Sequence, residues 1–462
     1  MTAIRGALPE SDRYQVDMCR GPLLRQIVTF AIPLIASGIL QLFFNAADLF
    51  VVGRFSASHR ALAAVGATGS VTHTLINLFI GLSIGANVLV ANHLGAHNRK
   101  GTSRTVHTAV MISLLGGALL AAAGIAGSER LLKLTDTPED ILEQSVLYMR
   151  IFFAGMPLIM LYNFGSAVLR AMGDTRRPFR FLVIAGIINV GLNLFFVICL
   201  RWDVAGVAAA TVISQGVAAL LVLRVLTNLR TACRVKLGNL RIEWKSLRAM
   251  MWIGVPAGFQ ASCYSISNII IQTALNSFGS AAVAGFTAAG TWEVVGYVSA
   301  AAIGQTALSF TGQNSGGRQY ARLRRALWYC AALSGGTLLV LGAAMLVWAR
   351  PLTAVFNSSP DVVAAGAERF RLTMPLFFVC GTAEVLTSVL RGLGKSVIPA
   401  LITVFCVCVM RIVYILTLWQ CCHTLGTLML TYPVTWSLNG IITGIYLHFV
   451  LRKLPKTDAP RP

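Results

Sequence analysis

Long apolar runs separated by short polar segments dominate the hydrophobic pattern of this chain. Each run reaches or exceeds the roughly 20 residues that an α-helix needs to cross about 30 Å of hydrocarbon. Continuous runs lack the alternation of a membrane β-strand, and lipid requires every backbone polar group to be paired within its own segment. We therefore predict twelve transmembrane helices, at approximately residues 24–53, 64–93, 104–127, 144–170, 178–200, 204–227, 247–277, 281–314, 322–349, 363–391, 397–420 and 424–450.

The composition agrees with an all-α membrane protein. Of the 462 residues, 56% are hydrophobic and only 12% are charged, against roughly 25% charged residues in soluble domains. Most of the 38 Lys and Arg residues flank one set of helix ends, together with both termini. This asymmetry predicts a multi-pass protein of the plasma or inner membrane with both termini in the cytoplasm. Anionic headgroups account for the net charge of +21, so no nucleic-acid partner is expected.

Gly394-Lys395-Ser396 raises the question of a nucleotide-binding loop. A phosphate-binding loop of the G-x-x-x-x-G-K-[ST] type needs glycine where this chain has Val389. The segment VLRGLGKSVIP, which ends at Pro399, instead repeats VLRAMGDTRRP, which ends at Pro178. We interpret it as a cytoplasmic turn with Arg391 facing lipid headgroups and Pro399 starting a helix. We expect no nucleotide, no cofactor and no enzymatic activity, and the ten scattered cysteines predict neither a disulfide nor a metal site.

The offset between these two segments recurs along the chain, so the sequence is a duplicated unit of six helices. Residues 61–69 match residues 282–290, Gly95 matches Gly316 and, with a slip of two, Pro33 matches Pro256. An even number of helices gives both copies the same orientation, with a pseudo-two-fold axis along the membrane normal. The predicted organisation is a cytoplasmic tail at residues 1–22, a first lobe at 23–230, a cytoplasmic linker at 231–246, a second lobe at 247–451 and a cytoplasmic tail at 452–462.

One polar face of the first helix contains an acidic residue inside the membrane. Gln41, Asn45 and Asp48 stand at i, i+4 and i+7, which is one side of a helix. Asn189, Asn193 and Thr211 lie at a similar predicted depth, counted from the outer helix ends. Oxygen-bearing groups around one carboxylate suit a proton or a hard cation, with Asp48, Asn189 and Asn193 as candidate Na⁺ ligands. The alternative is an interhelical hydrogen-bond network that carries no ion.

The second copy has different polar residues inside its predicted helices. Ile271 aligns with Asp48, whereas Glu293, Glu384 and Arg411 are further charged residues within spans. A buried guanidinium requires a carboxylate partner, so we expect Arg411 to pair with Glu384 or Glu293, leaving the other acid for a cation. A purely structural ion pair is the alternative. Gln260, Asn268 and Gln272 form a further polar stripe, which is more typical of helix packing than of ligand contact. We expect Gln260 to lie in one buried polar cluster with Glu293, Glu384 and Arg411.

Several motifs together resemble the multidrug and toxic compound extrusion (MATE) transporters. They are FNAADLFVVG around Asp48, GANVLVANHLGA, LSFTGQNSGG, both VLRxxG turns and YPVTW at residues 432–436, and they cover essentially the whole chain. The resemblance implies two six-helix lobes, alternating access, and export of cationic amphipathic compounds in exchange for Na⁺ or H⁺. It also implies roles for Asp48 and Asn189. Several branches of the family carry a second acid where this chain has Asn193, and some keep acids matching Glu293 and Glu384.

Other function classes remain as alternatives. A lipid-linked oligosaccharide or lipid flippase of the same superfamily would be expected to line its cavity with several Arg or Lys residues, whereas Arg150 and Arg411 are the two that we assign to the membrane interior rather than to loops and helix ends. A channel would need a filter loop or a ring of charge, and neither is evident. For the transporter we expect hinges at Pro33 and Pro256, where a helical hydrogen bond is missing. The expected partners are small organic cations and the lipid bilayer, and the expected state is a monomer.

Overall fold

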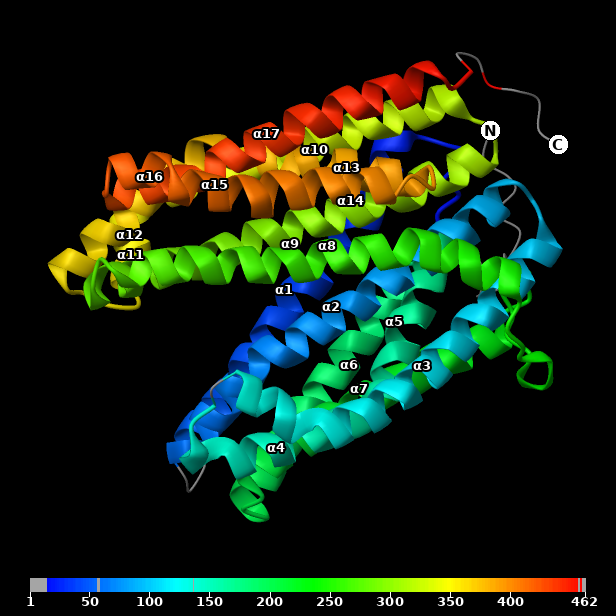
Figure 1. Ribbon diagram of the computed structural model, residues 1–462. Coiled ribbons are helices and arrows are strands. Elements are labelled where there is room, and N and C mark those ends of the chain that lie inside the picture. Colours follow the sequence, from blue (N-terminus) through cyan, green and yellow to red (C-terminus); the bar gives the residue numbers. More distant parts are fainter. Residues whose placement is uncertain (1–14, 56–58, 136, 456–457, 459–462) are drawn as a thin grey trace, which may run out of the picture. The chain divides into compact units, whose positions relative to one another are not determined.

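The structure is a computed structural model that describes residues 15–55, 59–135, 137–455 and 458. Within these ranges nearly every residue is helical and no strand occurs (Figure 1). Ten helices of this described part are long and apolar enough to span a membrane, or eleven if the bent pair Glu139–Ala154 and Met156–Ala171 forms one span. The long helix Trp244–Asn276 is not among them. The all-helical membrane fold is therefore confirmed, while the count of twelve spans stays a prediction.

The chain divides into two compact units. Of the described residues, unit 1 comprises those within 15–17 and 32–255, and unit 2 comprises those within 18–31 and 256–458. Both divisions inside the helical region fall within long helices, at Ala31/Ile32 and at Val255/Pro256. These points lie beside the two predicted hinge prolines, Pro33 and Pro256. The helix that begins at Leu23 therefore has its first turns, up to Ala31, in unit 2. The helix that begins at Trp244 has its first turns, up to Val255, in unit 1.

Unit 1 contains most of the first half of the sequence. Its helices are α1 (Leu23–Phe55, from Ile32 on), α2 (His59–Gly95), α3 (Arg99–Leu134), α4 (Glu139–Ala154), α5 (Met156–Ala171), α6 (Arg176–Leu194), the π-helical turn η1 (Phe195–Cys199), α7 (Asp203–Asn228) and the short 3-10 turn η2 (Leu237–Asn239). Helix α3 packs on α2, α4 and α5, and α6 packs on α7. At Gly155 the chain bends by 48° between α4 and α5.

Unit 2 repeats this order. It contains α8 (Trp244–Asn276, from Pro256 on), α9 (Ser280–Gly316), α10 (Tyr320–Val347), α11 (Ala349–Ala354), α12 (Pro360–Thr373), η3 (Met374–Leu376), α13 (Phe377–Gly392), α14 (Val397–Thr403), the π-helical turn η4 (Val404–Val409), α15 (Met410–Leu416), α16 (Leu418–Cys421) and α17 (Leu425–Arg452). Helix α9 is central and packs on α10, α12 and α13.

The helix bounds bear out the predicted duplication. Helix α8 follows α1 by the offset of the sequence repeat at both its first and its last residue, and α9 follows α2 in the same way. Left-handed residues recur at this offset, with φ of +93° at Gly173 and +76° at Gly394. Because glycine adopts this conformation without a steric cost, both turns can bend sharply there. By these bounds the residue equivalent to Asp48 is Ile269, two positions before the expected Ile271, so the second copy is apolar at either position.

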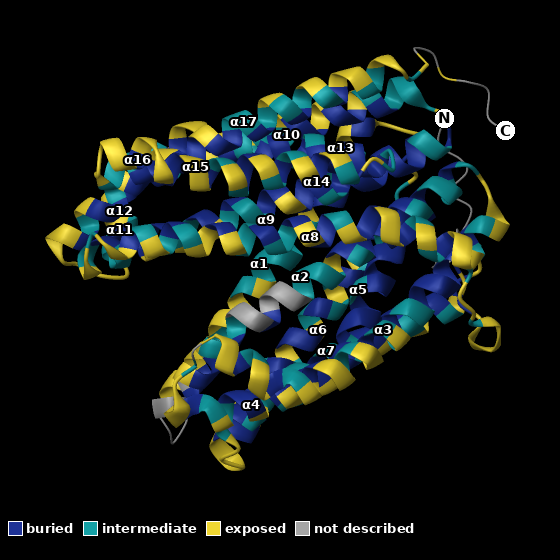
Figure 2. Cartoon of the chain, viewed as in Figure 1, coloured by how far each residue is buried: buried dark blue, intermediate teal, exposed yellow. Residues whose placement is uncertain are grey.

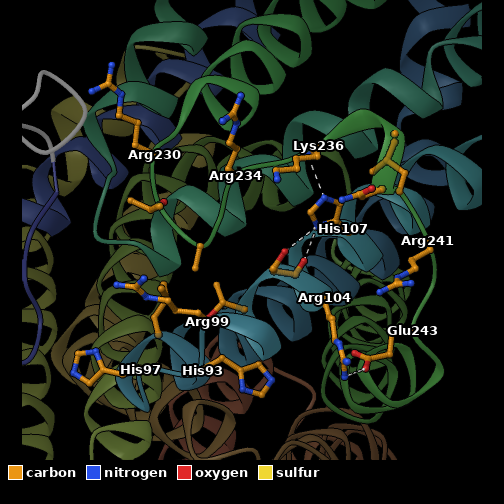
Figure 3. A pocket seen from close by; sticks show the side chains of 18 residues that line it. His93, His97, Arg99, Arg104, His107, Arg230, Arg234, Lys236, Arg241 and Glu243 are labelled. Atoms are coloured by element: carbon orange, nitrogen blue, oxygen red, sulfur yellow. Dashed lines mark hydrogen bonds and ion pairs between the residues drawn. The ribbon is translucent and has the colours of Figure 1, made fainter.

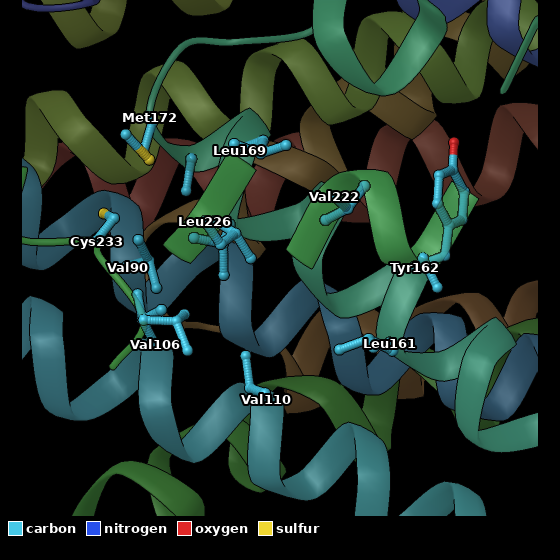
Figure 4. Close-up of a cluster of buried hydrophobic side chains, with 14 of the residues drawn as sticks. Val90, Val106, Val110, Leu161, Tyr162, Leu169, Met172, Val222, Leu226 and Cys233 are labelled. Carbon is cyan, nitrogen blue, oxygen red and sulfur yellow. The ribbon is translucent and has the colours of Figure 1, made fainter. Parts of the chain in front are cut away.

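The interior of unit 1 is built from small and branched apolar side chains. Figure 4 shows Val90, Val106, Leu161, Val222 and Leu226 in one buried cluster contributed by α2, α3, α5 and α7. Large apolar side chains such as Leu119, Ile187 and Val340 are exposed on helices of both units (Figure 2), as lipid contact permits. This packing holds the polar groups of the functional site at fixed positions along the helices.

The turn that contains Gly394 differs from the expectation in one respect. Arg391 was predicted to face lipid headgroups, but its side chain is buried and Nη2 donates to Oε1 of Gln260 over 2.7 Å. The error has a simple cause, since the arginine stands in the last turn of α13 and long helical side chains lean back toward the preceding turns. That direction takes the guanidinium inward.

Candidate functional site

The Asp48 carboxylate lies at a cavity inside unit 1. The cavity has a volume of about 520 Å³, and Asp48 is the only carboxylic acid among the described residues that line it. Gln41 and Asn45 line it as well and remain exposed, so the polar face of α1 borders the cavity. Asn189 and Thr211 complete this side of the wall. The structure therefore brings the predicted residues of three separate helices to one place.

Asn193 contacts the acid directly. Its Nδ2 lies 2.5 Å from Oδ1 of Asp48 and 3.3 Å from Oδ1 of Asn189. Asn189 in turn donates from Nδ2 toward Oγ1 of Thr211 over 3.5 Å, and Thr211 also interacts with the Asp48 carboxylate. Because these residues come from α1, α6 and α7, the chain of polar contacts ties three helices together at the depth of the acid.

One oxygen in this group has no hydrogen-bond partner in the described structure. Both donor contacts of Asn193 use Nδ2, and its Oδ1 is buried without a partner. A buried carbonyl oxygen that accepts nothing costs free energy, about 1–3 kcal/mol. Beside a carboxylate, such an oxygen can accept a proton donor or contact a cation.

The local geometry of α6 explains how Asn193 reaches Asp48. A Cβ atom at Gly186 would overlap the Phe44 ring, so glycine at this position of α6 leaves room for an aromatic side chain of α1. Directly after Asn193 the helix widens into the π-helical turn at Phe195–Cys199. Such turns recur at functional sites because they change the direction of the following side chains.

In unit 2, Glu293 forms a closed ion pair with Arg369, a residue that no sequence pattern singled out. Arg369 donates from Nε and Nη2 to the two carboxylate oxygens over 2.8 and 2.6 Å. Both side chains are at most 5% exposed. Arg369 also lies 3.7 Å from the ring centroid of Phe286. The carboxylate oxygens of Glu293 are thus occupied by a guanidinium, which supports the structural reading of this acid.

The predicted pairing of Arg411 with Glu293 or Glu384 is wrong. Its Nη1 donates to Ser267 Oγ over 3.0 Å and to Asn268 Oδ1 over 3.2 Å, and its guanidinium lies over the Tyr432 ring. Among the described residues, no carboxylate lies within 4.0 Å of Arg411. The polar face of α8 and the π electrons of Tyr432 take the place of a counter-ion. Gln272 contributes only a local contact with Asn276.

Glu384 is the less constrained acid of unit 2. Its Oε1 lies 3.9 Å from Nη1 of Arg391 and 3.4 Å from Ser388 Oγ, with 31% of the side chain exposed. Gln260, which was expected in one cluster with all three charged residues, instead contacts Arg391. The predicted polar cluster is therefore three separate groups, around Glu293, around Glu384 and around Arg411.

A family model now fits both halves of this arrangement. The MatE family model matches residues 33–195 and 256–417, which together make up more than half of the chain. The chain belongs to the MatE family. Both matched segments begin at one of the prolines predicted as hinges and end before α7 and α17, so the family model covers equivalent parts of the two halves.

MatE relatives and structures cover most of the chain. It is 28% identical over 383 residues to the probable multidrug resistance protein YpnP of Bacillus subtilis, covering 82% of this chain and 84% of the relative. It is 26% identical over 430 residues to an FAD transporter of Shewanella oneidensis, covering 91% and 93%. The structure of a MOP superfamily transporter from Pyrococcus furiosus matches with a TM-score of 0.88 at 22% identity, covering 96% of this chain and all of that one. This MatE protein is thus a multi-pass membrane protein.

Several residues that line the Asp48 cavity or pair with a buried acid could not be singled out from the sequence. Tyr148, Phe152 and Tyr162 line the Asp48 cavity beside Asn163. They stand in helices α4 and α5, where aromatic residues at helical spacing are indistinguishable from core. Arg369 was missed because it lies near the outer end of a predicted span, where a charge needs no partner. Only the contacts of the folded chain identify these roles.

Proposed function

We propose that this protein is a secondary active efflux transporter, which exchanges Na⁺ or H⁺ for a cationic or amphipathic organic compound. The observation that carries the proposal is the Asp48 carboxylate, which is bonded to Asn193 and is the single acid among the described residues that line the cavity of unit 1. An acid at this depth costs about 2.5–3.5 kcal/mol unless it faces a cavity, a partner or an ion. Asp48 has all the features of a site that gains and releases a positive charge.

The contacts suggest how the acid exchanges its partner. With an ionised carboxylate, Asn193 donates from Nδ2; with a protonated carboxyl group, a rotated Asn193 amide accepts the proton at Oδ1. Na⁺ would instead be held by the Asp48 carboxylate together with the amide oxygens of Asn189 and Asn193. Loading the site favours one orientation of the transporter only if the two states differ in affinity for the cation.

Helix α1 connects the Asp48 site with Pro33, where the helix can bend. Pro33 lies two turns of helix and more before Gln41, and the Ser37 hydroxyl donates to the Pro33 carbonyl over 2.7 Å. Proline removes a helical hydrogen bond, so bending is easiest there. We propose Pro33 and Pro256 as the hinges of the two halves, since both stand beside the divisions between the units.

The lining of the cavity supports an amphipathic substrate. Aromatic rings of Phe44, Tyr148, Phe152 and Tyr162 stand beside amides and one carboxylate, and this combination can bind flat apolar cations through ring faces and charge. YpnP is named as a probable multidrug resistance protein. An FAD transporter among the relatives shows that one branch bears the name of an anionic substrate instead.

A lipid or oligosaccharide flippase is the second candidate and is less favoured. An anionic pyrophosphate substrate needs cationic groups, and the described residues that line the Asp48 cavity include no Lys or Arg. We further propose a monomer in the plasma or inner membrane with both termini cytoplasmic, without a cofactor, a nucleotide or an enzymatic step.

Asp48→Asn tests the proposal. In proteoliposomes loaded with a fluorescent organic cation, imposed Na⁺ and pH gradients should drive efflux by the wild type and not by the variant. Asp361→Asn is the matched control, because it removes one exposed carboxylate outside the cavity. Both variants should elute as folded protein in detergent. Wild-type rates in Asp48→Asn would refute the role of this acid.

A further inference from the structure

Unit 1 has a second and larger cavity, with a volume of about 1120 Å³, that shares no lining residue with the Asp48 cavity. Its walls are the end of α2, the first turns of α3, and the linker segment formed by residues 230–243. Figure 3 shows that basic side chains from these walls surround it, namely Arg99, Arg104, Arg230, Arg234, Lys236 and Arg241.

The linker segment is fixed in place by the core of unit 1. Cys233 and Val235 are buried members of the apolar cluster that includes Val106 and Leu226, and Figure 4 shows Cys233 beside them. The backbone N–H of Val235 donates to the Leu226 carbonyl over 3.0 Å. A segment anchored in this way forms a wall of defined shape, unlike a freely solvated basic loop.

His107 provides the second anchor. Its Nδ1 lies 2.7 Å from the Ser103 carbonyl oxygen, which can only accept, so Nδ1 carries the proton. Its Nε2 therefore accepts from the backbone N–H of Lys236 over 3.1 Å (Figure 3). The imidazole is buried and neutral in this arrangement, and it joins α3 to the linker. Glu243 adds a third anchor through its backbone N–H, which donates to Thr108 Oγ1 over 3.1 Å.

The charges of the cavity are not balanced by protein groups. Glu243 is the only carboxylic acid among the described residues of the lining, and its Oε1 already accepts from Nη1 of Arg104 over 2.9 Å while Oε2 accepts from Ser246 over 2.7 Å. No carboxylate of the described residues pairs with the other five basic side chains. Five cations around one fixed volume raise the local concentration of anions.

The start of α3 and two exposed apolar residues indicate which class of anion the cavity would bind. Arg99, Thr102 and Ser103 from the first two turns of α3 line the cavity, so the positive end of a helix dipole adds to the field. Two exposed apolar side chains accompany the basic residues in the sequence, namely Leu237 within the linker segment and Trp244 directly after it. Tryptophan prefers the headgroup level of a bilayer, which places the linker where phosphate groups are abundant.

We propose that this cavity binds a phosphate group with two or more negative charges, supplied either by an anionic lipid headgroup or by a soluble phosphate compound. Arginine side chains hold such groups through paired N–H donors. Binding would brace the linker against α3 and is independent of the cation site at Asp48.

Calorimetric titration of the purified full-length protein in a neutral detergent tests the site. The probes are dioctanoyl phosphatidic acid, inorganic pyrophosphate and, as a neutral lipid, dioctanoyl phosphatidylcholine. We expect saturable binding of phosphatidic acid and none of phosphatidylcholine. Binding of pyrophosphate as well would extend the site to soluble phosphates, whereas its absence would assign the site to lipid. If neither phosphate probe binds, the proposal is overturned.

Two matched double variants separate the cavity from general surface charge. Arg230→Gln with Arg241→Gln removes two lining cations and should weaken binding about tenfold or more, since charge-assisted hydrogen bonds to phosphate are lost. Arg224→Gln with Arg248→Gln removes the same charge from exposed residues outside the lining and should leave affinity within about twofold. Equal losses in both variants would overturn the proposal, because any basic surface would then suffice.

Discussion

Asn193 donates a hydrogen bond from Nδ2 to Oδ1 of Asp48, and so joins the last turn of α6 to α1. The contact has a physical consequence. The charge of the acid is partly compensated by a neutral dipole, which leaves room for a cation. The acid is also bonded to a residue that stands two positions before the π-helical turn Phe195–Cys199.

Replacing Asn193 by leucine should weaken coupling without unfolding the protein. The variant removes the amide donor and the free amide oxygen together, so the cation loses a ligand and the carboxylate loses a hydrogen bond of about 1.5–3 kcal/mol. The cation concentration that gives half-maximal efflux from proteoliposomes should rise about tenfold or more. Asn163→Leu, which alters the same cavity without touching Asp48, is the control. An unchanged concentration dependence would show that Asn193 is not part of the site.

Glu293→Gln should lower stability far more than it lowers coupling. The substitution leaves the Arg369 guanidinium buried without its counter-charge, at a cost of about 3–5 kcal/mol. Thermal unfolding in detergent should show a clear drop in Tm. The double variant Glu293→Leu with Arg369→Met removes both charges and should recover most of the loss. If the double variant is no more stable than either single variant, the pair is not the structural element inferred here.

Arg411→Met should be tolerated, in contrast to Arg369→Met. Arg411 contacts neutral oxygens and the Tyr432 ring, so its removal leaves no buried charge behind, and methionine can occupy a similar volume. Arg369→Met leaves the Glu293 carboxylate unpaired. Comparing the two unfolding temperatures in the same detergent checks this. Equal destabilisation would indicate a charge partner for Arg411 that the contacts do not reveal.

Cys233 should resist alkylation until the linker is released from α3. Burial raises the pKa of its thiol to about 12, and the thiolate is the reactive form, so the reaction should be slow near neutral pH and should accelerate as pH rises toward that value. The exposed Cys421 and Cys422 should react quickly under the same conditions. Peptide mapping by mass spectrometry after timed maleimide treatment measures each site separately.

His107→Leu completes this experiment. The variant deprives the Lys236 N–H of its acceptor, and Cys233 should then react several times faster. Arg99→Gln alters the same cavity without a hydrogen bond to the linker and should leave the rate unchanged. A Cys233 rate that is fast in the wild type would contradict the anchored linker.

Much of unit 1 follows from the sequence because helical periodicity acts locally. The spacing of Gln41, Asn45 and Asp48 determines their common face, and counting residues from the helix ends is enough to predict the depth of Asn193. The internal repeat predicted the helix order of the second half, since equivalent sequences meet equivalent neighbours. These inferences need only the geometry of single helices.

The pairings in unit 2 could not be obtained in this way. Whether Glu293 meets Arg369 or Arg411 depends on helix rotation and on which helices are neighbours, and both guanidinium groups satisfy the same sequence argument. Arg391 turned inward because Gln260 of α8 offers an acceptor, which a turn motif does not reveal. The basic cavity between α2, α3 and the linker segment could not be predicted for a similar reason. A series of arginines in the sequence looks the same whether the side chains are fully solvated or line a cavity.

The division of α1 at Ala31 and of α8 at Val255 has a consequence for how such a protein can be assembled. If the chain were cut within residues 229–243, the first fragment would contain residues 18–31 of unit 2. The second fragment would contain the last residues of unit 1, up to Val255. Neither fragment can complete a unit by itself, so a split transporter should regain its structure only when both fragments are synthesised in the same membrane. By the same argument, an ancestral protein that consisted of one half of this chain would have needed a second copy of itself to complete each unit.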